Sequence, residues 1–414
     1  MSAPAERATR GDPVDPLGGP DAADGAFGAR RAGGASRATA LAGIAAHLDL
    51  WRARSADAEA DGRLGSETAD ELAATGAHRL LQPAAHGGAA SSFVDHLDAV
   101  AAVGEACASA SWCLAVWSVH NWMLARFDAA AQRDVWGDDP AARISASIVP
   151  RNRFERSAGG VIVHGRFPFA SGCDHASWFL LSGVVEAGDE PGPVMVLVPR
   201  HELTIDHGSW DVMGLRGTGS KDVVVESSVE VPAYRTVSYA ALATGAAPGS
   251  PPPAEPLHRA PFRPVAVAVL APPVLGAARA ALRRFVERID RRLTVPGGGS
   301  QRHDPAAGLR LAESSAEIDA AGLVMAETAH QLDRMGHDAS VDAVAAARIA
   351  RDTAFATRLA TRAVDRLFEA AGGSALQLGE PLQRAWRDVH AARTHAVLTW
   401  DNAANAYAQA VLGG

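Results

Sequence analysis

A chain of 414 residues is long enough for two or three structural units and a large core. The formal net charge of −8 at pH 7 offers no basic surface, so no nucleic-acid partner is expected. Cys107, Cys113 and Cys173 form no CxxC pair, and their odd number gives no disulfide framework, which favours a reducing, cytoplasmic location. We expect no membrane partner either, since no apolar run is expected to reach the roughly 20 residues of a membrane span.

Residues 1–35 are rich in Gly, Pro, Ala and Asp and lack the apolar segment of a signal peptide, which predicts a disordered tail. Helical patterns fill residues 36–145, which we interpret as an N-terminal helical domain. The segment SETADELAATGAHRLLQP predicts a helix that begins with Ser66 as its cap. The apolar segment FVDHLDAVAAVGEACASASWCLAVWSVHNWMLARF predicts one long helix that is buried on most of its sides.

Residues 146–242 change to short, Val-rich runs separated by Gly, Pro and Asp, namely GVIVHGRF, WFLLSGVV, VMVLVPR and DVVVESSVEVP. These runs predict a compact central β domain, either a sandwich or a barrel. A connector rich in Pro, Ala and Gly follows at residues 243–256. The predicted order is therefore a helical unit, a β unit and a linker.

Residues 257–414 return to helical periodicity, with apolar and small residues at steps of three and four. One stripe comprises Leu311, Ser314, Ile318, Ala321, Met325, Thr328, Leu332 and Met335, and a second comprises Ala345, Ile349, Ala356, Leu359, Ala363, Leu367 and Ala370. The segment LTVPGGGSQRHDPA would form a long loop before the first stripe. Such stripes predict an antiparallel helical bundle, so the fold class expected is α+β with a C-terminal bundle. Their small residues would also suit packing between subunits.

Several polar motifs admit a structural as well as a functional interpretation. In GLRGTGSKD, a strand-like run rather than a helix follows the glycines, so a turn is favoured over a dinucleotide-binding loop. The histidines lack HExxH or paired Cys/His spacing, so no metal is expected. Taken alone, Ser171 is more typical of a turn than of a catalyst, and His120 is more typical of a buried, hydrogen-bonded side chain. Small residues near His395 leave room for a ligand.

Five segments occur in the order and spacing of the acyl-CoA dehydrogenase superfamily, which the chain resembles over essentially residues 36–412: QPAAHGG, FPFASGCDHASW, MGLRGTGSKDVVVESSVEVP, LGAARAAL and PLQRAWRDVHAARTH. The resemblance implies a helical domain, a β domain and a four-helix bundle, usually in a tetramer. Dehydrogenases of this superfamily remove an α-proton with a glutamate. Here RDVHAARTHAVLTWD supplies no glutamate, and RPVAVAVLAPPVLGAARAAL supplies no carboxylate at the alternative position. Without that base, α,β-dehydrogenation has no first step and is not expected.

The chain more closely resembles the oxygenase components of two-component flavin-dependent monooxygenases, of the 4-hydroxyphenylacetate hydroxylase and aromatic polyketide hydroxylase type. The resemblance implies that Ser171 lies near flavin N5, that His395 lies beside substrate and flavin, and that His120 lines the same pocket. Aromatic side chains are most typical of core packing but also line pockets for planar ligands, and Trp112 and Trp117 are assigned to the substrate pocket on that basis. The residues assigned to the cofactor are Ser147, Ser171, Gly172, Trp178 and Arg263.

The resemblance also implies a different role for each of these residues. The Ser171 hydroxyl would hold the N5 proton of a C4a-hydroperoxide that forms from reduced flavin and O₂. Phe167, Phe169 and Trp178 would keep water away. His395 would take a proton from a phenol or an amine, because imidazole titrates near neutral pH.

The function expected is the hydroxylation of an aromatic, preferentially phenolic, small molecule with O₂ and reduced FMN, or alternatively FADH₂. No NAD(P)H-binding domain is recognisable, which implies a separate flavin reductase as partner. A homotetramer is also expected. Two alternatives stay open: an N- or S-oxygenase of an amine, amino sugar or thioether on the same fold, and a non-catalytic flavin-binding scaffold. The presence of both Ser171 and His395 argues against the scaffold.

Overall fold

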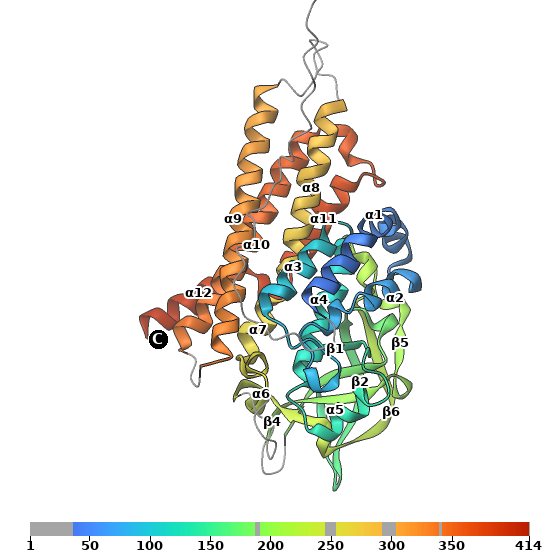
Figure 1. Cartoon of the computed structure of the whole chain (residues 1–414). Coiled ribbons are helices and arrows are strands. Elements are labelled where there is room, and N and C mark those ends of the chain that lie inside the picture. Colours follow the sequence, from blue (N-terminus) through green and yellow to red (C-terminus); the bar gives the residue numbers. More distant parts are fainter. Residues whose placement is uncertain (1–35, 187–190, 245–253, 292–303, 339–341, 414) are drawn as a thin grey trace, which may run out of the picture. The chain divides into compact units, whose positions relative to one another are not determined.

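The computed structural model describes residues 36–186, 191–244, 254–291, 304–338 and 342–413. The predicted tail, most of the predicted connector and most of the predicted loop LTVPGGGSQRHDPA lie outside these ranges. Helices come first and last in the described chain and strands lie between them, as Figure 1 shows.

The helices before the sheet are α1 (Arg37–Asp61), α2 (Ser66–Ala74), α3 (Phe93–Gly104), α4 (Ala108–Leu124) and α5 (Ala129–Trp136). Every side chain of α4 is buried, so this helix belongs to the centre of the apolar core. Ser66 is the first helical residue, and the cap is Gly65, which has no side chain to accept a hydrogen bond. The predicted Ser66 cap is therefore wrong by one residue.

The single long helix predicted in this region is two helices, because the chain breaks between α3 and α4 at residues 105–107. Just before the break, α3 crosses α8 (Pro272–Arg291) with the two backbones in contact. A Cβ atom on Gly104 would lie 2.9 Å from the Gly276 Cα, and a Cβ atom on Gly276 would lie 2.3 Å from the Ala101 carbonyl oxygen. Only glycine fits at this crossing. After the break α4 packs beside α3, which one straight helix could not do.

Seven strands form a single mixed sheet in the order β5-β6-β2-β1-β3-β4-β7. The strands are β1 (Ile144–Arg156), β2 (Gly160–Ala170), β3 (Trp178–Val185), β4 (Gly192–Pro199), β5 (Thr204–Asp206), β6 (Lys221–Pro232) and β7 (Thr236–Ser238). The β1–β3 pair is parallel, and the other neighbouring pairs are antiparallel. The Val-rich runs of the sequence coincide with β2, β3, β4 and β6.

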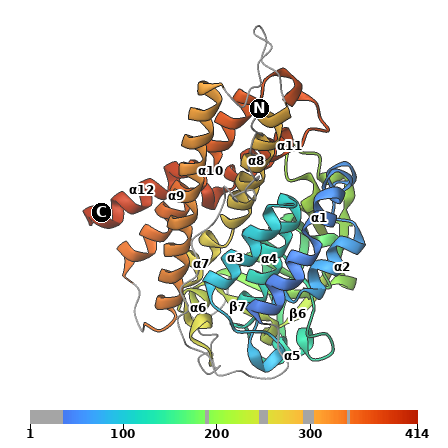
Figure 2. The ribbon, with the colours of Figure 1, turned by 45° about the horizontal axis from the view of Figure 1, so that its top comes forward.

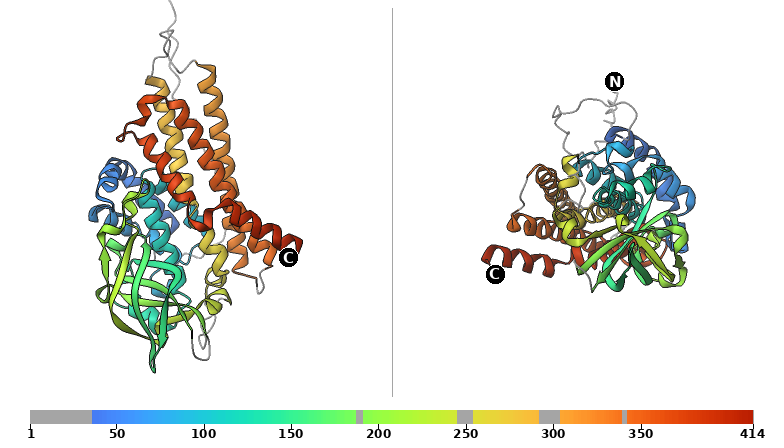
Figure 3. Two further views of the ribbon diagram at one scale, coloured as in Figure 1. Left: turned by 180° about the vertical axis from the view of Figure 1, so that it is seen from behind. Right: turned by 90° about the horizontal axis from the view of Figure 1, so that it is seen from below.

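The sheet bends around its own apolar core (Figure 3). Phe154 on β1, Phe167 on β2 and Phe179 on β3 belong to one buried cluster with Val196 on β4 and Val223 on β6. Three strands separate β4 from β6 in the sheet, so a flat sheet could not bring these side chains together. The structure thus has one curved sheet in place of the two separate layers of a sandwich.

The helices after the sheet are α6 (Tyr239–Thr244), α7 (Phe262–Ala268), α8 (Pro272–Arg291), α9 (Pro305–Met335), α10 (Ala343–Ala371), α11 (Pro381–Arg393) and α12 (Trp400–Leu412). Helices α8 to α11 pack against one another as a bundle (Figure 2). α9 buries every residue of its predicted stripe except Leu311, which is partly buried, and α10 buries its own except Ala345 and Ala370. The periodicity therefore identified the packed faces of both helices.

The segment Phe262–Ile289 is long and apolar enough to cross a membrane by length and composition alone. The expectation that no apolar run reaches such a length is therefore wrong. The most apolar window of this segment is 78% buried within the structure. Such burial is typical of a helix in the core of a protein, which is apolar on all sides because it has neighbours on all sides.

Candidate active site

Ser171 lies in the turn after β2, where three parts of the chain meet. The indole N–H of Trp112, on α4, donates to the Ser171 hydroxyl at 3.2 Å. The Ser220 hydroxyl, just before β6, lies 2.7 Å from the same oxygen. The Ser145 hydroxyl, on β1, donates to the Ser171 carbonyl at 2.9 Å. Ser171 itself is only half-buried, which leaves it within reach of a ligand.

The turn depends on Gly172, which has a φ of +68° and donates its N–H to the Thr218 carbonyl at 2.9 Å. A Cβ atom at this position would lie 2.6 Å from Trp117 Nε1. Both the backbone conformation and the available space therefore require glycine. The structure explains Gly172 by packing, and its contact with a cofactor stays a prediction.

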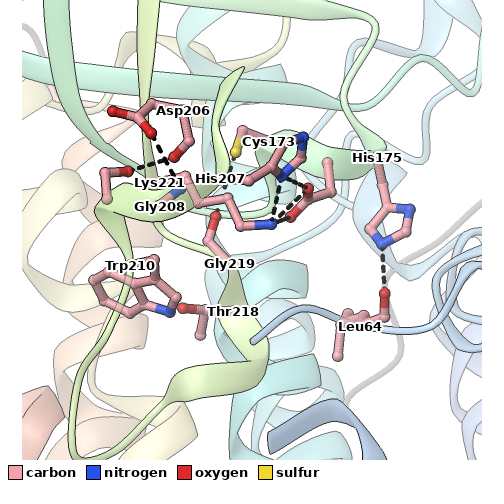
Figure 4. A network of polar contacts seen from close by, with 12 residues as sticks. Leu64, Cys173, His175, Asp206, His207, Gly208, Trp210, Thr218, Gly219 and Lys221 are labelled. Atoms are coloured by element: carbon pink, nitrogen blue, oxygen red, sulfur yellow. Dashed lines mark hydrogen bonds and ion pairs between the residues drawn. The ribbon is translucent and has the colours of Figure 1, made fainter. Parts of the chain in front are cut away.

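A buried ion pair joins the Ser171 turn to the start of β6 (Figure 4). Lys221 Nζ donates to the two carboxylate oxygens of Asp174 at 2.7 and 2.8 Å, and these side chains are 5% and 4% exposed. His207 Nδ1 lies 3.2 Å from the same Nζ, and the Cys173 thiol donates to the Gly219 carbonyl at 3.3 Å. Because a buried charge without a partner is strongly destabilising, the pair holds the two loops in one arrangement. Lys221 is the only lysine in the sequence.

His120 lies eight residues after Trp112 on α4, about 12 Å further along the helix. Its Nδ1 donates to the Ile144 carbonyl of β1 at 2.8 Å, so Nε2 of the neutral ring is left as an acceptor. Within the described residues, Nε2 has no hydrogen-bond partner. Burial lowers the pKa of His120 to about 4, so the ring is neutral near pH 7.

His395 follows α11 and caps the short turn Ala396–Leu398. Its ring lies against Trp112, with the ring centroids 5.8 Å apart, and its Nδ1 accepts the Val397 N–H at 3.4 Å. We assign the proton of the neutral ring to Nε2 on this basis, which makes Nε2–H a donor. The residue is exposed, yet the protein atoms around the ring displace enough solvent to lower its pKa. The ring is therefore in contact with protein atoms and is also open to solvent.

The structure brings Ser171, Trp112 and His395 together through direct contacts, with His120 further along α4. These four residues come from α4, the β2 turn and the segment after α11, so all three regions of the chain contribute. Among the described residues, no three His, Cys, Asp or Glu side chains are arranged to hold a metal ion.

Three further residues lie on segments that adjoin this cluster. Ser147, on β1, donates its hydroxyl to the Pro168 carbonyl at 2.7 Å. Arg263 is exposed on α7, which packs against the turn that follows His395. Phe169 is 63% exposed, has a φ of +62° and meets the Trp210 ring edge-on. A large apolar ring that is held exposed in an unfavourable backbone conformation is suited to cover a flat ligand.

Three other residues assigned to the site have different surroundings. Trp117 is fully buried, and Phe167 packs in the β core against Phe154. Trp178 lines a separate surface depression of about 610 Å³, where the Arg235 guanidinium lies 5.1 Å from the centre of its ring. Trp117 and Phe167 are therefore enclosed in apolar cores and Trp178 faces a separate depression, whereas Phe169 alone of the predicted wall is largely exposed.

Thr218 and Ser220 belong to the site, although GLRGTGSKD predicts only a turn. The turn is present, since Arg216–Thr218 forms a 3₁₀ turn and β6 follows it directly. Its two hydroxyl groups lie 2.7 Å apart, and that of Ser220 reaches Ser171. Two hydroxyl residues on either side of Gly219 are the only signal in the sequence that points to this role.

Asp388, on α11, connects the same turn to the bundle. Its carboxylate accepts the Leu215 N–H at 2.6 Å. The side chain is buried, and burial raises its pKa to about 6. Because α11 also leads to His395, the two halves of the site share one helix.

Known proteins resemble this chain over most of its length. Residues 268–400 match the family model described as "Acyl-CoA dehydrogenase, C-terminal domain". The chain is 38% identical to "Flavin-dependent monooxygenase, oxygenase subunit HsaA" of Rhodococcus jostii (strain RHA1), over 84% of this chain and 92% of that protein. It is 33% identical to "FADH(2)-dependent resorcinol hydroxylase, oxygenase component" of Rhizobium sp. (strain MTP-10005), over 90% of this chain and 93% of that protein. The solved structure "XiaF from Streptomyces sp. in complex with FADH2 and Glycerol" superposes with a TM-score of 0.84 at 28% identity, over 91% of this chain and 96% of that chain. The chain therefore belongs to the oxygenase subunits of flavin-dependent monooxygenases, with an acyl-CoA dehydrogenase-like fold of helices and a mixed sheet.

Proposed function

We propose that this chain hydroxylates an aromatic, preferentially phenolic, small molecule with O₂ and reduced flavin, which a separate flavin reductase delivers. The observation that carries the proposal is the contact of Trp112 with both Ser171 and His395, which places a hydroxyl and an imidazole beside one indole. A relative named as the oxygenase component of a resorcinol hydroxylase supports both the phenolic substrate and the reductase partner.

The residues around Ser171 fit a flavin ring. Ser171 offers a hydroxyl at the open side of the turn, and the exposed Phe169 ring beside it can cover a planar ligand. Bound reduced flavin supplies the electrons that activate O₂. The protein's part is to place the ring, to hold a proton at N5 through Ser171 and to exclude water. Two of the named relatives specify FADH₂, which favours FADH₂ over the FMN expected from the sequence.

The two histidines can make hydrogen bonds of opposite direction to a phenolic substrate. His120 Nε2 can accept the hydrogen bond of a phenol, and His395 Nε2–H can donate one to an oxygen atom. This assignment exchanges the roles that the sequence predicts, in which His395 is the base. A pKa of about 4 makes His120 a weak base, so it holds and polarises the hydroxyl without taking its proton permanently.

A homotetramer of three-domain subunits completes the proposal. Leu309 and Leu323 on α9 are 73% and 67% exposed, and Leu376 and Leu378 lie exposed between α10 and α11. Exposed apolar side chains of this size are typical of surfaces that pack against a partner, and closed symmetric assemblies are the common solution. Sedimentation of the purified protein as a monomer at micromolar concentration would contradict the tetramer.

The proposed function is tested by measuring product and H₂O₂ together, with a flavin reductase and a series of phenols. Ser171→Ala should keep the far-UV circular dichroism of the wild type, because a half-buried hydroxyl adds little to stability. It should form H₂O₂ in place of product, with a loss of yield of about tenfold, because alanine cannot hold the N5 proton. Ser177→Ala, an exposed serine of the same segment, is the matched control and should change neither quantity. Preferential turnover of amines or thioethers would overturn the proposed substrate class.

A further inference from the structure

A series of hydrogen bonds runs from α4 to the loop before β6. Trp112 Nε1 donates to Ser171 Oγ at 3.2 Å, and Ser171 Oγ lies 2.7 Å from Ser220 Oγ. Ser220 Oγ lies 2.7 Å from Thr218 Oγ1, and Thr218 donates its proton to the Leu215 carbonyl oxygen at 2.8 Å. We call Ser171, Ser220 and Thr218 the hydroxyl chain. Thr218 and Ser220 are 2% and 6% exposed, so water competes little for their hydroxyls.

Counting protons fixes the direction of every bond in the hydroxyl chain. A hydroxyl has one proton to donate and two lone pairs that accept. The Leu215 carbonyl only accepts, so the Thr218 proton is used there and Thr218 must accept from Ser220. The Ser220 proton is then used as well, so Ser220 must accept from Ser171. Ser171 therefore donates inward and accepts from Trp112, which leaves one lone pair for its open side.

The far end of the hydroxyl chain is held from two directions. Leu215 has a φ of +53°, and its carbonyl accepts both the N–H and the hydroxyl of Thr218, at 3.0 and 2.8 Å. The Leu215 N–H donates to the Asp388 carboxylate at 2.6 Å. The buried ion pair between Asp174 and Lys221 closes the other side of the same loop. The donor direction is thus a property of the fold and does not depend on free rotation of a hydroxyl.

We infer that Thr218 and Ser220 fix Ser171 as an obligate acceptor and thereby set how strongly the site prefers reduced over oxidised flavin, an inference that rests on the proposed function. N5 of reduced flavin carries a hydrogen, which the open lone pair of Ser171 can accept. N5 of oxidised flavin carries a lone pair in the same direction, which would face the Ser171 lone pair. Ser171 can donate to oxidised flavin only by giving up its bond to Ser220. Thr218 and Ser220 are positioning residues that act through Ser171.

The dissociation constants of both redox forms test this inference without turnover. Oxidised flavin is titrated by fluorescence quenching, and reduced flavin is titrated in the absence of O₂. Thr218→Val and Ser220→Ala each interrupt the hydroxyl chain and free the Ser171 proton. Each variant should bind oxidised flavin about tenfold more tightly, the effect of one hydrogen bond. Binding of reduced flavin should change less, so the ratio of the two constants should fall.

Two control variants separate the direction of the chain from a general disturbance of the turn. Thr218→Ser keeps the hydroxyl and should keep the wild-type ratio. Ser145→Ala removes a hydroxyl that is bonded to the Ser171 carbonyl and lies outside the hydroxyl chain. It should lower the two affinities in parallel and leave their ratio unchanged.

Each outcome of these titrations supports or overturns the inference. If the wild type prefers reduced flavin and the folded Thr218→Val and Ser220→Ala variants keep that ratio, the inference is overturned and the proposed function stands. An equal change of the ratio in Ser145→Ala would also overturn it. A wild type that binds neither form of flavin would overturn the proposed function together with the inference. Circular dichroism establishes which variants fold, and either interrupting variant suffices.

Discussion

The two sides of the candidate site are built differently. On the side of Ser171, which we call the cofactor side, Thr218 and Ser220 are almost completely buried and each hydroxyl has a partner within 2.8 Å. On the side of His395, which we call the substrate side, residues 393–396 are all exposed. The His395 ring is held by one long hydrogen bond of 3.4 Å and by its contact with an indole.

This difference matches the two tasks of such an enzyme. A flavin presents the same atoms at every turnover, so fixed and fully paired groups can be set against it in advance. A substrate has to enter and a product has to leave, and segments that allow this are drawn from the exposed, weakly held parts of a fold. Under the proposed function, the structure therefore combines a buried, fully paired cofactor side with an exposed substrate side.

The largest effect should come from breaking the cofactor side at its ion pair. Lys221→Met leaves the buried Asp174 carboxylate without its partner, which should lower the free energy of unfolding by about 3–5 kcal/mol. Urea denaturation followed by circular dichroism measures this loss. The double variant Asp174→Leu/Lys221→Met removes both charges and should recover most of it. A single variant as stable as the wild type would mean that other contacts hold the two loops.

The next effect concerns Asp388, which connects the two sides through α11. Burial raises its folded-state pKa to about 6, above the ordinary value of 3.8. The folded state therefore binds this proton more tightly, and the stability that this provides at low pH is lost as the pH rises through about 6. The Asp388→Asn variant has no titrating group at this position. Its free energy of unfolding, relative to that of the wild type, should therefore rise by about 1–3 kcal/mol from about pH 4 to about pH 8. Parallel stability profiles of the two proteins would contradict this.

A smaller effect is expected at His120, the buried histidine on α4. His120→Leu removes the Nε2 acceptor and should lower kcat/KM for a phenol by about tenfold, the effect of one hydrogen bond. Binding of the same aromatic ring without its hydroxyl should be unaffected, and this ligand serves as the control. Equal losses for both ligands would mean that the substitution disturbs the shape of the pocket.

The smallest effect should be the response of the substrate side to acid. Because burial by the protein around His395 lowers its pKa below the ordinary value of 6.5, the ring should stay neutral to a lower pH than a free imidazole does. The hydroxylation rate should therefore change less than about twofold between about pH 7.5 and about pH 6.5. His395→Gln, which keeps a donor and cannot titrate, provides the reference profile. A wild-type rate that falls with a midpoint near 6.5 would show an unperturbed ring.

Burial along helices could be predicted because it repeats at steps of three and four residues, as the α9 and α10 stripes show. The positions of the tryptophans could not be assigned in this way. Trp112 and Trp117 are five residues apart on α4, which separates them by about 140° around the helix, so they face different surroundings. Both are large and apolar, and the pattern does not tell which one contacts Ser171 and which one is enclosed in the core.

The hydroxyl chain lay beyond sequence reasoning for a different reason. Ser171 and Ser220 are 49 positions apart, and their contact depends on how β2 pairs with β6. The register of that pair shifts between Phe167 and Ala170, immediately before Ser171. A single sequence does not specify such an irregularity, and a shift of one residue would place every following side chain on the other face. Motif resemblance proposed Ser171 as a site residue, and only the structure gives its hydrogen-bond partners.

The burial of Lys221 has a practical consequence. The sequence contains no other lysine, so Lys221 Nζ is the only side-chain amine of the chain, and the side chain is 5% exposed. Acylating reagents directed at amines should leave the side chains of the folded protein unmodified and react with Lys221 only when the two loops separate. The rate of that single labelling event, followed by mass spectrometry, would therefore report how often the cofactor side opens, without any introduced probe.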